Sequence, residues 1–344
     1  MHDLKTGPTI VTGGAGFIGS ALIWALNRRG IDDILVVDIL DQGEKWKNLV
    51  PLRFRDYLDA ADFERRVLEQ PQHFGDTGPV FHFGACSSTL ETDAAYLMRN
   101  NFQYTKNLAH WAVARGARFL YASSAATYGE LETDLCECEE LDTLRPLNMY
   151  AYSKHLFDCY AQSHGLLGSI TGLKYFNVFG PNEDHKGEMR SLVHKAFTQI
   201  VSGGSVKLFK SHRTEYADGE QQRDFLYVKD AVEMTLHLAA DSSALGLFNV
   251  GSGQPHTWLE LVRPIFAALG LSENIEFIEM PAALREKYQY CTRACLHRLR
   301  ATGYTKCVTN LRDAVTDYVR NYLLRGGRLD PNDGVGASQE MVNL

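Results

Sequence analysis

Tyr150 and Lys154 are the residues whose types and spacing most directly indicate chemistry. They lie four positions apart, and side chains with that spacing share one face of a helix. A lysine ammonium beside a phenol favours the phenolate, so the pKa of the tyrosine falls from its usual ~10 toward the range of a working base. Such a group can take the proton of a secondary alcohol. The spacing alone is a weak signal, and its value depends on the motifs that accompany it.

A glycine-rich turn near the N-terminus is the first of these motifs. A buried strand at Thr9–Val11 precedes Gly13, Gly16 and Gly19, and an apolar-periodic helix is expected from Phe17 to Arg29. The first glycine permits a tight turn, the second lets the backbone approach a pyrophosphate, and the third lets the helix pack on the strand. The helix N-terminus then offers free N–H groups to phosphates. The pattern predicts a dinucleotide site.

Two further polar residues follow predicted strands. Asp38 ends the strand Ile34–Val37, about 20 residues beyond the glycines, where a carboxylate can bind the adenosine ribose. Ser124 ends the strand Arg118–Ser124, and active residues of open α/β sheets lie beyond the carboxyl ends of strands. Its hydroxyl can hydrogen-bond the reacting oxygen beside Tyr150; the alternative is a serine that completes a local turn.

The alternation of strands and helices predicts an α/β protein with a doubly wound parallel (Rossmann) sheet. We expect an NAD(P)-binding domain at residues 1–176. A smaller α/β substrate domain, with segments that cross back to the first, is expected at 177–325, where Asp230 and Thr257 should cap helices. Residues 326–344, rich in Gly, Asp and Asn, are expected to form a disordered tail.

The composition excludes several classes of protein. The 344 residues are 45% hydrophobic with a net charge of −7, so a full core is available and there is no basic surplus for nucleic acid or anionic lipid. No apolar stretch reaches the ~18 residues of a membrane helix, and the N-terminus lacks a signal-peptide pattern. The seven cysteines are scattered, and Cys136-Glu137-Cys138 has no matching second pair, so we expect free thiols in a reducing cytoplasm and no metal site.

Longer motifs resemble a known family. The chain resembles the extended short-chain dehydrogenase/reductases, which include NAD(P)-dependent sugar epimerases. The resemblance lies in the glycine turn, in the serine that follows a strand and in the Tyr-x-x-x-Lys motif. Over about residues 8–324 the chain resembles, within that group, the ADP-L-glycero-D-manno-heptose 6-epimerases. The segments that carry the resemblance are Gly13–Ser20, Gly84–Thr89, Tyr121–Gly129, Tyr175–Pro181, His185–Gly187 and Arg223–Phe225.

This resemblance implies an isomerase that inverts C6 of ADP-D-glycero-β-D-manno-heptose in lipopolysaccharide core precursor synthesis. No group next to C6 stabilises a carbanion, so the stereocentre is inverted through a planar ketone that can take hydride back on either face. Tyr150 and Lys186 correspond to two acid/base groups. Lys154 corresponds to the residue that binds the nicotinamide ribose and lowers the pKa of the tyrosine, and Ser124 completes the implied catalytic set.

The implied cofactor is tightly bound NADP, with NAD as the alternative. Lys45 suits the 2′-phosphate of NADP, whereas the carboxylate of Asp38 repels it. The family also implies a cytoplasmic homo-oligomer, a pentamer, whose partner is the ADP-heptose substrate and which binds neither nucleic acid nor membrane.

The remaining site residues are carried over position by position. The dinucleotide contacts are Gly13, Gly16, Phe17, Ile18, Gly19, Asp38, Ile39, Lys45, Phe83, Gly84, Ala85, Cys86, Ser87, Asn100, Lys154, Val178 and Lys186. The substrate contacts are Ser87, Asn177, Glu188, Lys195, Phe209, Lys210, Ser211, Arg223 and Tyr288. Arg223 can pair with a pyrophosphate through two hydrogen bonds, or it can form a salt bridge between domains.

Three departures from the family pattern and three other functions bear on this interpretation. Phe83 replaces an acid, Glu188 a small hydroxyl residue, and Ala60 a frequent lysine.

A 4,6-dehydratase needs an Asp-Glu pair after the serine to expel water, but Ala125-Ala126 stand there. A hexose 4-epimerase shares the fold and needs no second base. A non-catalytic dinucleotide-binding regulator would not need the intact set of Ser124, Tyr150 and Lys154.

Overall fold

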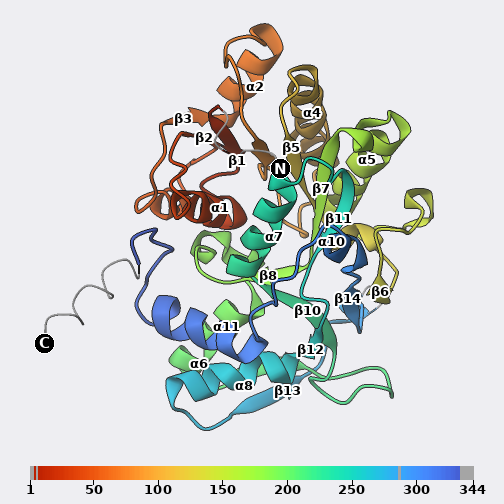
Figure 1. Cartoon of the computed structure of the whole chain (residues 1–344). Coiled ribbons are helices and arrows are strands. Elements are labelled where there is room, and N and C mark those ends of the chain that lie inside the picture. Colours follow the sequence, from red (N-terminus) through yellow and green to blue (C-terminus); the bar gives the residue numbers. More distant parts are fainter. Residues whose placement is uncertain (1–3, 5–6, 286–287, 334–344) are drawn as a thin grey trace, which may run out of the picture.

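The computed structural model describes residues 4, 7–285 and 288–333. Its centre is a seven-stranded sheet in the order β11-β7-β5-β4-β1-β2-β3, with parallel pairing throughout (Figure 1). Read from the other edge, this is the doubly wound order in which a dinucleotide site lies at the reversal between β1 and β4. The predicted fold class is therefore confirmed. The strands are β1 (Thr9–Thr12), β2 (Ile34–Asp38), β3 (Asp56–Asp59), β4 (Val80–His82), β5 (Phe119–Ser124), β7 (Ile170–Tyr175) and β11 (Gly246–Val250).

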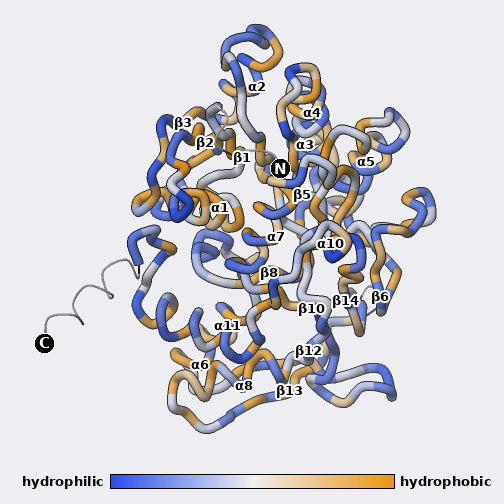
Figure 2. Tube along the Cα trace, in the orientation of Figure 1, coloured by the Kyte–Doolittle hydropathy of each residue, from blue (hydrophilic) through white to orange (hydrophobic). Residues whose placement is uncertain are grey.

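Helices cover both faces of this sheet, as parallel strands require. One face carries α1 and α7, which contact each other, and the other carries α2, α4 and α5. Figure 2 shows α1 as largely hydrophobic and α2 as more hydrophilic, in keeping with nine buried residues in α1 and two in α2. The helices are α1 (Phe17–Asn27), α2 (Ala60–Glu69), α3 (Ala94–Leu97), α4 (Tyr104–Ala114), α5 (Met149–Ser163) and α7 (Val228–Ala240).

The later part of the chain builds smaller sheets below the carboxyl ends of the large one. The order β12-β10-β8 forms one sheet, β9 pairs with β13, and β6 pairs with β14. Its strands are β8 (Asn177–Phe179), β9 (Val206–Phe209), β10 (Gln222–Tyr227), β12 (Pro255–Thr257), β13 (Ile275–Ile278) and β14 (Thr292–Ala294), and the earlier part of the chain contributes β6 (Thr133–Leu135). Its helices are α6 (Leu192–Gly203), α8 (Trp258–Leu269), α9 (Ala282–Arg285), α10 (His297–Ala301) and α11 (Leu311–Asp317).

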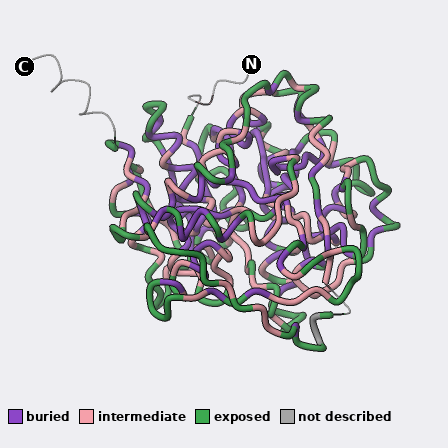
Figure 3. The backbone as a smooth tube through the Cα atoms, turned by 90° about the horizontal axis from the view of Figure 1, so that it is seen from below, coloured by how far each residue is buried: buried purple, intermediate pink, exposed green. Residues whose placement is uncertain are grey.

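Short 3-10 and π segments complete the chain. The 3-10 segments are η1 (Lys45–Asn48), η3 (Ala125–Tyr128), η4 (Leu141–Thr143), η5 (Leu166–Gly168) and η6 (Asp184–Met189), and the π segments are η2 (Met98–Gln103) and η7 (Tyr318–Leu323). Because η2 lies directly between α3 and α4, a π turn joins these two helices. Figure 3 shows buried segments in the interior of the view and exposed ones around its rim.

The chain crosses between the two parts more than once. β11 returns from beyond residue 177 to pair with β7, and β6 leaves the first part to pair with β14. The division at residue 176 stays a prediction. Among the described residues, no helix has both the length and the apolar character that a membrane crossing demands.

Three local expectations are resolved by the structure. Thr257 caps α8 and forms a reciprocal capping box with Glu260, as expected. Asp230 is not a cap, because α7 begins after Tyr227; its carboxylate lies in the first turn and accepts a hydrogen bond from Thr309 N at 2.9 Å. The tail prediction is wrong for residues 326–333, because the backbone N–H of the buried Leu329 donates to the side chain of Asn182. Residues 334–344 lie outside the described part of the chain.

Candidate active site

A pocket of about 520 Å³ opens at the carboxyl ends of the central strands. It joins the turn between β1 and α1, the ends of β4 and β5, the start of α5, and η6. The residues that line it are Gly13, Gly16, Phe17, Ile18, Gly19, Asp38, Lys45, Phe83, Gly84, Ala85, Cys86, Ser87, Ser88, Thr89, Ala122, Ser123, Ser124, Tyr150, Lys154, Tyr175, Phe176, Val178, His185, Lys186 and Met189. Residues predicted from distant motifs thus share one cavity.

The turn that contains Gly13, Gly16 and Gly19, called here the glycine cradle, has no room for a side chain at Gly13 or Gly19. A Cβ on Gly19 would lie 2.1 Å from the carbonyl oxygen of Gly13, and a Cβ on Gly13 would lie 2.6 Å from the backbone nitrogen of Gly84. Gly13 also has a φ of +67°, which favours glycine. Gly16 occupies the N-cap of α1 and supplies no side chain to it. This close, uncapped helix start fits a pyrophosphate.

Asp38 and Lys45 lie at the far end of the cradle and contact each other. Asp38 Oδ2 accepts from Ala15 N at 2.8 Å, while Oδ1 accepts from Ile39 N at 2.7 Å and from Lys45 Nζ at 2.6 Å. The lysine therefore offsets the carboxylate charge that would repel a 2′-phosphate. The Ile39 side chain is exposed and does not line the pocket.

His185 also lines this pocket, although the sequence analysis assigned no role to it. Burial lowers its pKa to about 4, and the neighbouring cations Lys45 and Lys186 act in the same direction. The imidazole is therefore neutral near pH 7, and its Nδ1 lies 3.3 Å from Asn48 Nδ2. The motif His185–Gly187 indicated that this segment matters, but only the fold shows the ring near Lys45.

Tyr150 lies in the first turn of α5, which begins here because Asn148 caps it by accepting from Ala151 N at 2.8 Å. Burial raises the pKa of Tyr150, and the hydroxyl of Ser124, hydrogen-bonded to the phenol, acts in the opposite direction. This reverses the expected lowering by Lys154. Burial of the phenol is the larger effect. The ammonium of Lys154 donates to Ala122 O at 2.9 Å, and burial lowers the pKa of this lysine to about 8.

Lys186 enters the same pocket from η6. Its ammonium lies 5.1 Å from the centre of the Phe17 ring, at the start of α1. Burial lowers the pKa of Lys186, and only Glu183 opposes this shift. Lys186 is half-buried, and a lysine whose pKa is lowered in this way gives up its proton more readily than an exposed lysine does.

Asn101 fixes the wall of the pocket that contains Cys86. Its side chain accepts from Cys86 N at 2.8 Å and donates to Cys86 O at 2.9 Å, and it also donates to Ser153 Oγ on α5. The family resemblance assigns the neighbouring Asn100 to the dinucleotide contacts; neither asparagine is among the residues that line the pocket, and that contact stays a prediction. Consecutive helical residues point in different directions, and the π turn η2 changes the register, so sequence reasoning could not tell which of them contacts Cys86.

The nine predicted substrate residues are not gathered in this cavity, which contains only Ser87 among them. Arg223 on β10 lies over the rings of Tyr288 (4.9 Å) and Trp258 (5.8 Å), so among the described residues its partners are aromatic rather than a carboxylate. Lys195 pairs with Glu188 at 3.5 Å. The other predicted contacts lie on the smaller sheets or their loops: Asn177, Phe209, Lys210 and Ser211.

Comparisons with known proteins agree with this geometry. The model of the NAD dependent epimerase/dehydratase family matches residues 9–251. An ADP-L-glycero-D-manno-heptose-6-epimerase of Nitratidesulfovibrio vulgaris (strain DP4) is 50% identical over 315 residues, which cover 91% of this chain and 97% of the relative. The solved structure of the Helicobacter pylori ADP-L-glycero-D-manno-heptose-6-epimerase is 28% identical with a TM-score of 0.78, covering 93% of this chain and 98% of that one.

A further solved structure was determined with a cofactor. The Thermus thermophilus UDP-glucose 4-epimerase in complex with NAD is 28% identical with a TM-score of 0.70, and the match covers 92% of this chain and 99% of that one. The glycine cradle, the acid after β2 and the family match together indicate a nicotinamide dinucleotide as cofactor and a nucleotide sugar as substrate. The chain belongs to the NAD dependent epimerase/dehydratase family.

Proposed function

We propose that this protein converts ADP-D-glycero-β-D-manno-heptose to its L-glycero epimer by inverting C6, as a step toward lipopolysaccharide core precursors. The observation that carries the proposal is the presence of two candidate acid/base groups, Tyr150 and Lys186, in one pocket with the glycine cradle. The substrate is suggested by relatives that bear this name at up to 50% identity.

In the first half-reaction Tyr150 takes the proton of the C6 hydroxyl as the carbon becomes a ketone. A bound nicotinamide supplies the hydride acceptor and donor, and its oxidised ring carries a positive charge that favours phenolate. The Ser124 hydroxyl, against the phenol, orients the reacting oxygen. The ammonium of Lys154, buried beside Ala122, is placed to hold the nicotinamide ribose.

In the second half-reaction the ketone presents its other face after turning within the pocket. Its oxygen then needs a proton from a second group, and Lys186 on η6, which lines the same pocket as Tyr150, supplies it. The lowered pKa of Lys186 makes the loss and gain of this proton easier than for an ordinary lysine. No net oxidation occurs, because the hydride returns to the carbon that it left.

The direct test is to incubate the purified protein with ADP-D-glycero-β-D-manno-heptose and to follow the C6 configuration of the product by NMR. We expect an equilibrium mixture of the two epimers and no stoichiometric reduced cofactor. UDP-glucose is the matched control substrate for the hexose 4-epimerase function. Turnover of UDP-glucose without turnover of the heptose would overturn the proposal.

For the cofactor we propose tightly bound NADP. The ion pair between Lys45 and Asp38 supports it, because the cation is held where a 2′-phosphate would meet the carboxylate. Mass spectrometry of the nucleotide released on denaturation should identify NADP, and Lys45→Ala should weaken NADP binding more than NAD binding. Release of NAD alone, or equal weakening of both, would contradict this choice.

The family resemblance also supports two coarser proposals. We propose that the protein acts in the cytoplasm, where nucleotide sugars are made, and that it assembles as a homo-oligomer, a pentamer by resemblance. Analytical ultracentrifugation of the purified chain tests the assembly state.

A further inference from the structure

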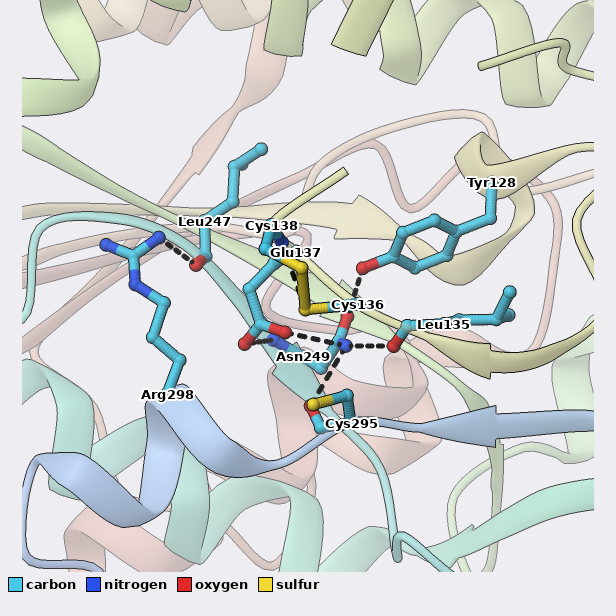
Figure 4. Close-up of a disulfide and its surroundings, with 9 residues drawn as sticks. All are labelled: Tyr128, Leu135, Cys136, Glu137, Cys138, Leu247, Asn249, Cys295 and Arg298. Carbon is cyan, nitrogen blue, oxygen red and sulfur yellow. Dashed lines mark hydrogen bonds between the residues drawn. A yellow bond between two sulfur atoms is a disulfide. The ribbon is translucent and has the colours of Figure 1, made fainter. Parts of the chain in front are cut away.

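Three cysteines meet at the ends of two paired strands, away from the pocket described above. Cys136 follows β6 and is joined to Cys138 by a disulfide, with the two Cα atoms 5.1 Å apart. Cys295 follows β14 and is a free thiol. Figure 4 shows Cys295 next to the disulfide, on the neighbouring strand. The expectation of free thiols throughout is therefore wrong for Cys136 and Cys138, whose separation of two residues brings both sulfurs together.

The strand register places Cys295 beside Cys136 rather than beside Cys138. β6 and β14 are parallel, with Leu135 opposite Ala294, so the next pair is Cys136 and Cys295. The Cys295 N–H continues the ladder by donating to Leu135 O at 3.0 Å. Adjacent strands lie about 4.8 Å apart, which is within the Cα separation that a disulfide spans. The Sγ atoms of Cys136 and Cys295 lie within 4.8 Å of each other.

Asn249 holds both cysteine segments in this position. The buried side chain of Asn249 donates to Leu135 O at 2.8 Å and to Cys295 O at 3.1 Å. Its amide oxygen accepts from the Tyr128 hydroxyl at 2.7 Å. The sulfurs are therefore brought together by a rigid network anchored on β11, so that exchange between them needs no rearrangement of the strands.

A metal site is a less suitable use of this cluster. Cys136, Cys295 and Glu137 lie close enough to hold an ion. However, Glu137 is already engaged, because its carboxylate accepts from Asn249 N at 3.2 Å and from Asn249 Nδ2 at 3.0 Å. The sulfur of Cys136 is also committed to the disulfide. A thiol beside a disulfide is instead the arrangement that exchange requires.

We propose that Cys136, Cys138 and Cys295 form a thiol–disulfide exchange site in which Cys136 bonds to either Cys138 or Cys295. The Cys295 thiolate attacks Cys136 Sγ, so the new bond forms as the Cys136–Cys138 bond breaks. Cys138 leaves as a thiolate and takes up the proton that Cys295 released to solvent. One disulfide is consumed and one is formed, so the internal step needs no oxidant.

The surroundings of the three sulfurs favour this exchange. Cys138 is exposed and lines a surface pocket of about 280 Å³, so the released thiol meets solvent and external thiols. The Cys136–Cys138 ring is very short, and the restriction of the unfolded chain by a disulfide grows with the loop that it closes. A Cys136–Cys295 bond closes a far longer loop and ties β6 covalently to β14.

The exchange is tested by trapping both disulfides in the intact protein. The protein is equilibrated in glutathione buffers of graded redox ratio, quenched with acid, alkylated with N-ethylmaleimide and digested with trypsin. Trypsin places Cys136 and Cys138 in the peptide Phe119–Lys154 and Cys295 in Ala294–Arg298. Mass spectrometry should find the cross-linked pair of peptides and the internally bonded single peptide in the same sample.

Variants separate the proposal from non-specific oxidation. Cys138→Ser should shift the population to the Cys136–Cys295 cross-link, because glutathione disulfide caps Cys136 and Cys295 then displaces glutathione. Cys295→Ser should lose the cross-link and keep the Cys136–Cys138 bond. Cys291→Ser is the matched control, because Cys291 is a free cysteine at the start of the same strand, and it should behave like the wild type.

The outcomes that overturn the proposal are equally specific. If folded Cys138→Ser retains only glutathione on Cys136, with Cys295 alkylated, the two sulfurs do not exchange. The same holds if Cys291 forms the cross-link in place of Cys295. Oxidised Cys138→Ser should also melt at a higher temperature than its reduced form, because the longer loop is closed, and an unchanged Tm would contradict the bond between β6 and β14.

Discussion

At the scale of single residues, the pocket contains two lysines, Lys154 and Lys186. Burial lowers the pKa of both, and we expect them to have different roles. Lys154 is held by the carbonyl of Ala122 and is fixed in place, whereas Lys186 lies over the ring of Phe17. A fixed ammonium suits binding of a ribose, whereas the lowered pKa of Lys186 suits transfer of a proton. The raised pKa of Tyr150 indicates that the phenol needs the charge of a bound cofactor to ionise readily.

Replacing Tyr150 with phenylalanine should lower the turnover number by at least about 100-fold, because the ring remains while the proton acceptor is lost. Cofactor should stay bound, since the glycine cradle is unchanged, and mass spectrometry of released nucleotide checks this. Tyr152→Phe is the control, because this ring on the same helix is 44% exposed and does not line the pocket. Near-normal turnover of Tyr150→Phe would exclude it as the base.

Lys186→Met should abolish epimerisation while retaining hydride transfer from one epimer. The reason is that each acid/base group serves one orientation of the ketone, so a single half-reaction survives. Stopped-flow absorbance of reduced nicotinamide measures this, with each epimer supplied separately. Lys207→Met, which removes a half-exposed lysine paired with Glu276 outside the pocket and outside the predicted substrate contacts, serves as the control. Epimerisation at the wild-type rate would mean that Tyr150 suffices, and the hexose 4-epimerase function would then be favoured.

At the scale of elements, the active groups are held by a buried network that joins two strands to α5. Asp158 on α5 accepts from Tyr121 at 2.8 Å and from Ser123 at 2.7 Å, both on β5, and from Lys174 on β7 at 3.0 Å. Because Asp158 lies one helical turn beyond Lys154, this network fixes the rotation of α5. The helix therefore presents Tyr150 and Lys154 to the end of β5, where Ser124 lies.

The β1–α1 turn has no space for an added methyl group at Gly19. Gly19→Ala should destabilise the protein by about 1–3 kcal/mol, a typical cost of overpacking, because the new methyl would meet the Gly13 carbonyl. Nucleotide affinity should fall with it, as the cradle must open. Gly168→Ala is the control, because a Cβ there meets nothing within 4 Å. Urea unfolding and nucleotide titration measure both effects; unchanged values for Gly19→Ala would show that the turn adapts.

At the scale of the whole molecule, burial of the Lys154 ammonium lowers the free energy of unfolding of the protein. Burial lowers the pKa of Lys154 to about 8 from the 10.5 of an exposed lysine, so the folded state binds this proton less tightly than the unfolded chain. The destabilisation is complete below pH 8 and disappears above about pH 10.5. Burial of this lysine therefore lowers the free energy of unfolding at neutral pH, and it positions a cation in the pocket.

A pH series on nucleotide-free protein tests this linkage. Between about pH 8 and 10.5 the free energy of unfolding of the wild type should rise relative to Lys154→Met, by up to about 1.4 kcal/mol per pH unit. The unfolded state binds more protons in this interval, which gives the positive sign. Urea unfolding at each pH provides the measurement. A constant difference between the two proteins would mean that the lysine is not desolvated.

The sequence by itself predicted a doubly wound parallel sheet, which the structure confirms, and it predicted a dinucleotide site and the Tyr150–Lys154 pair. These follow from local signals, because glycine spacing, strand ends and an i, i+4 pair are fixed by backbone geometry over a few residues. The capping residue of α8 was recognised for the same reason. The resemblance added Lys186, whose position in a loop gives no periodic signal.

Only the tertiary structure decided contacts between distant segments. The direction of the Tyr150 pKa shift depends on burial by the whole pocket, and the pairing of Lys45 with Asp38 depends on how η1 folds against β2. The contact of Asn101 with Cys86, the packing of Leu329 and the approach of Cys295 to Cys136 were equally inaccessible. Such contacts join residues far apart in the chain, and no local sequence pattern indicates which distant side chains will be in contact.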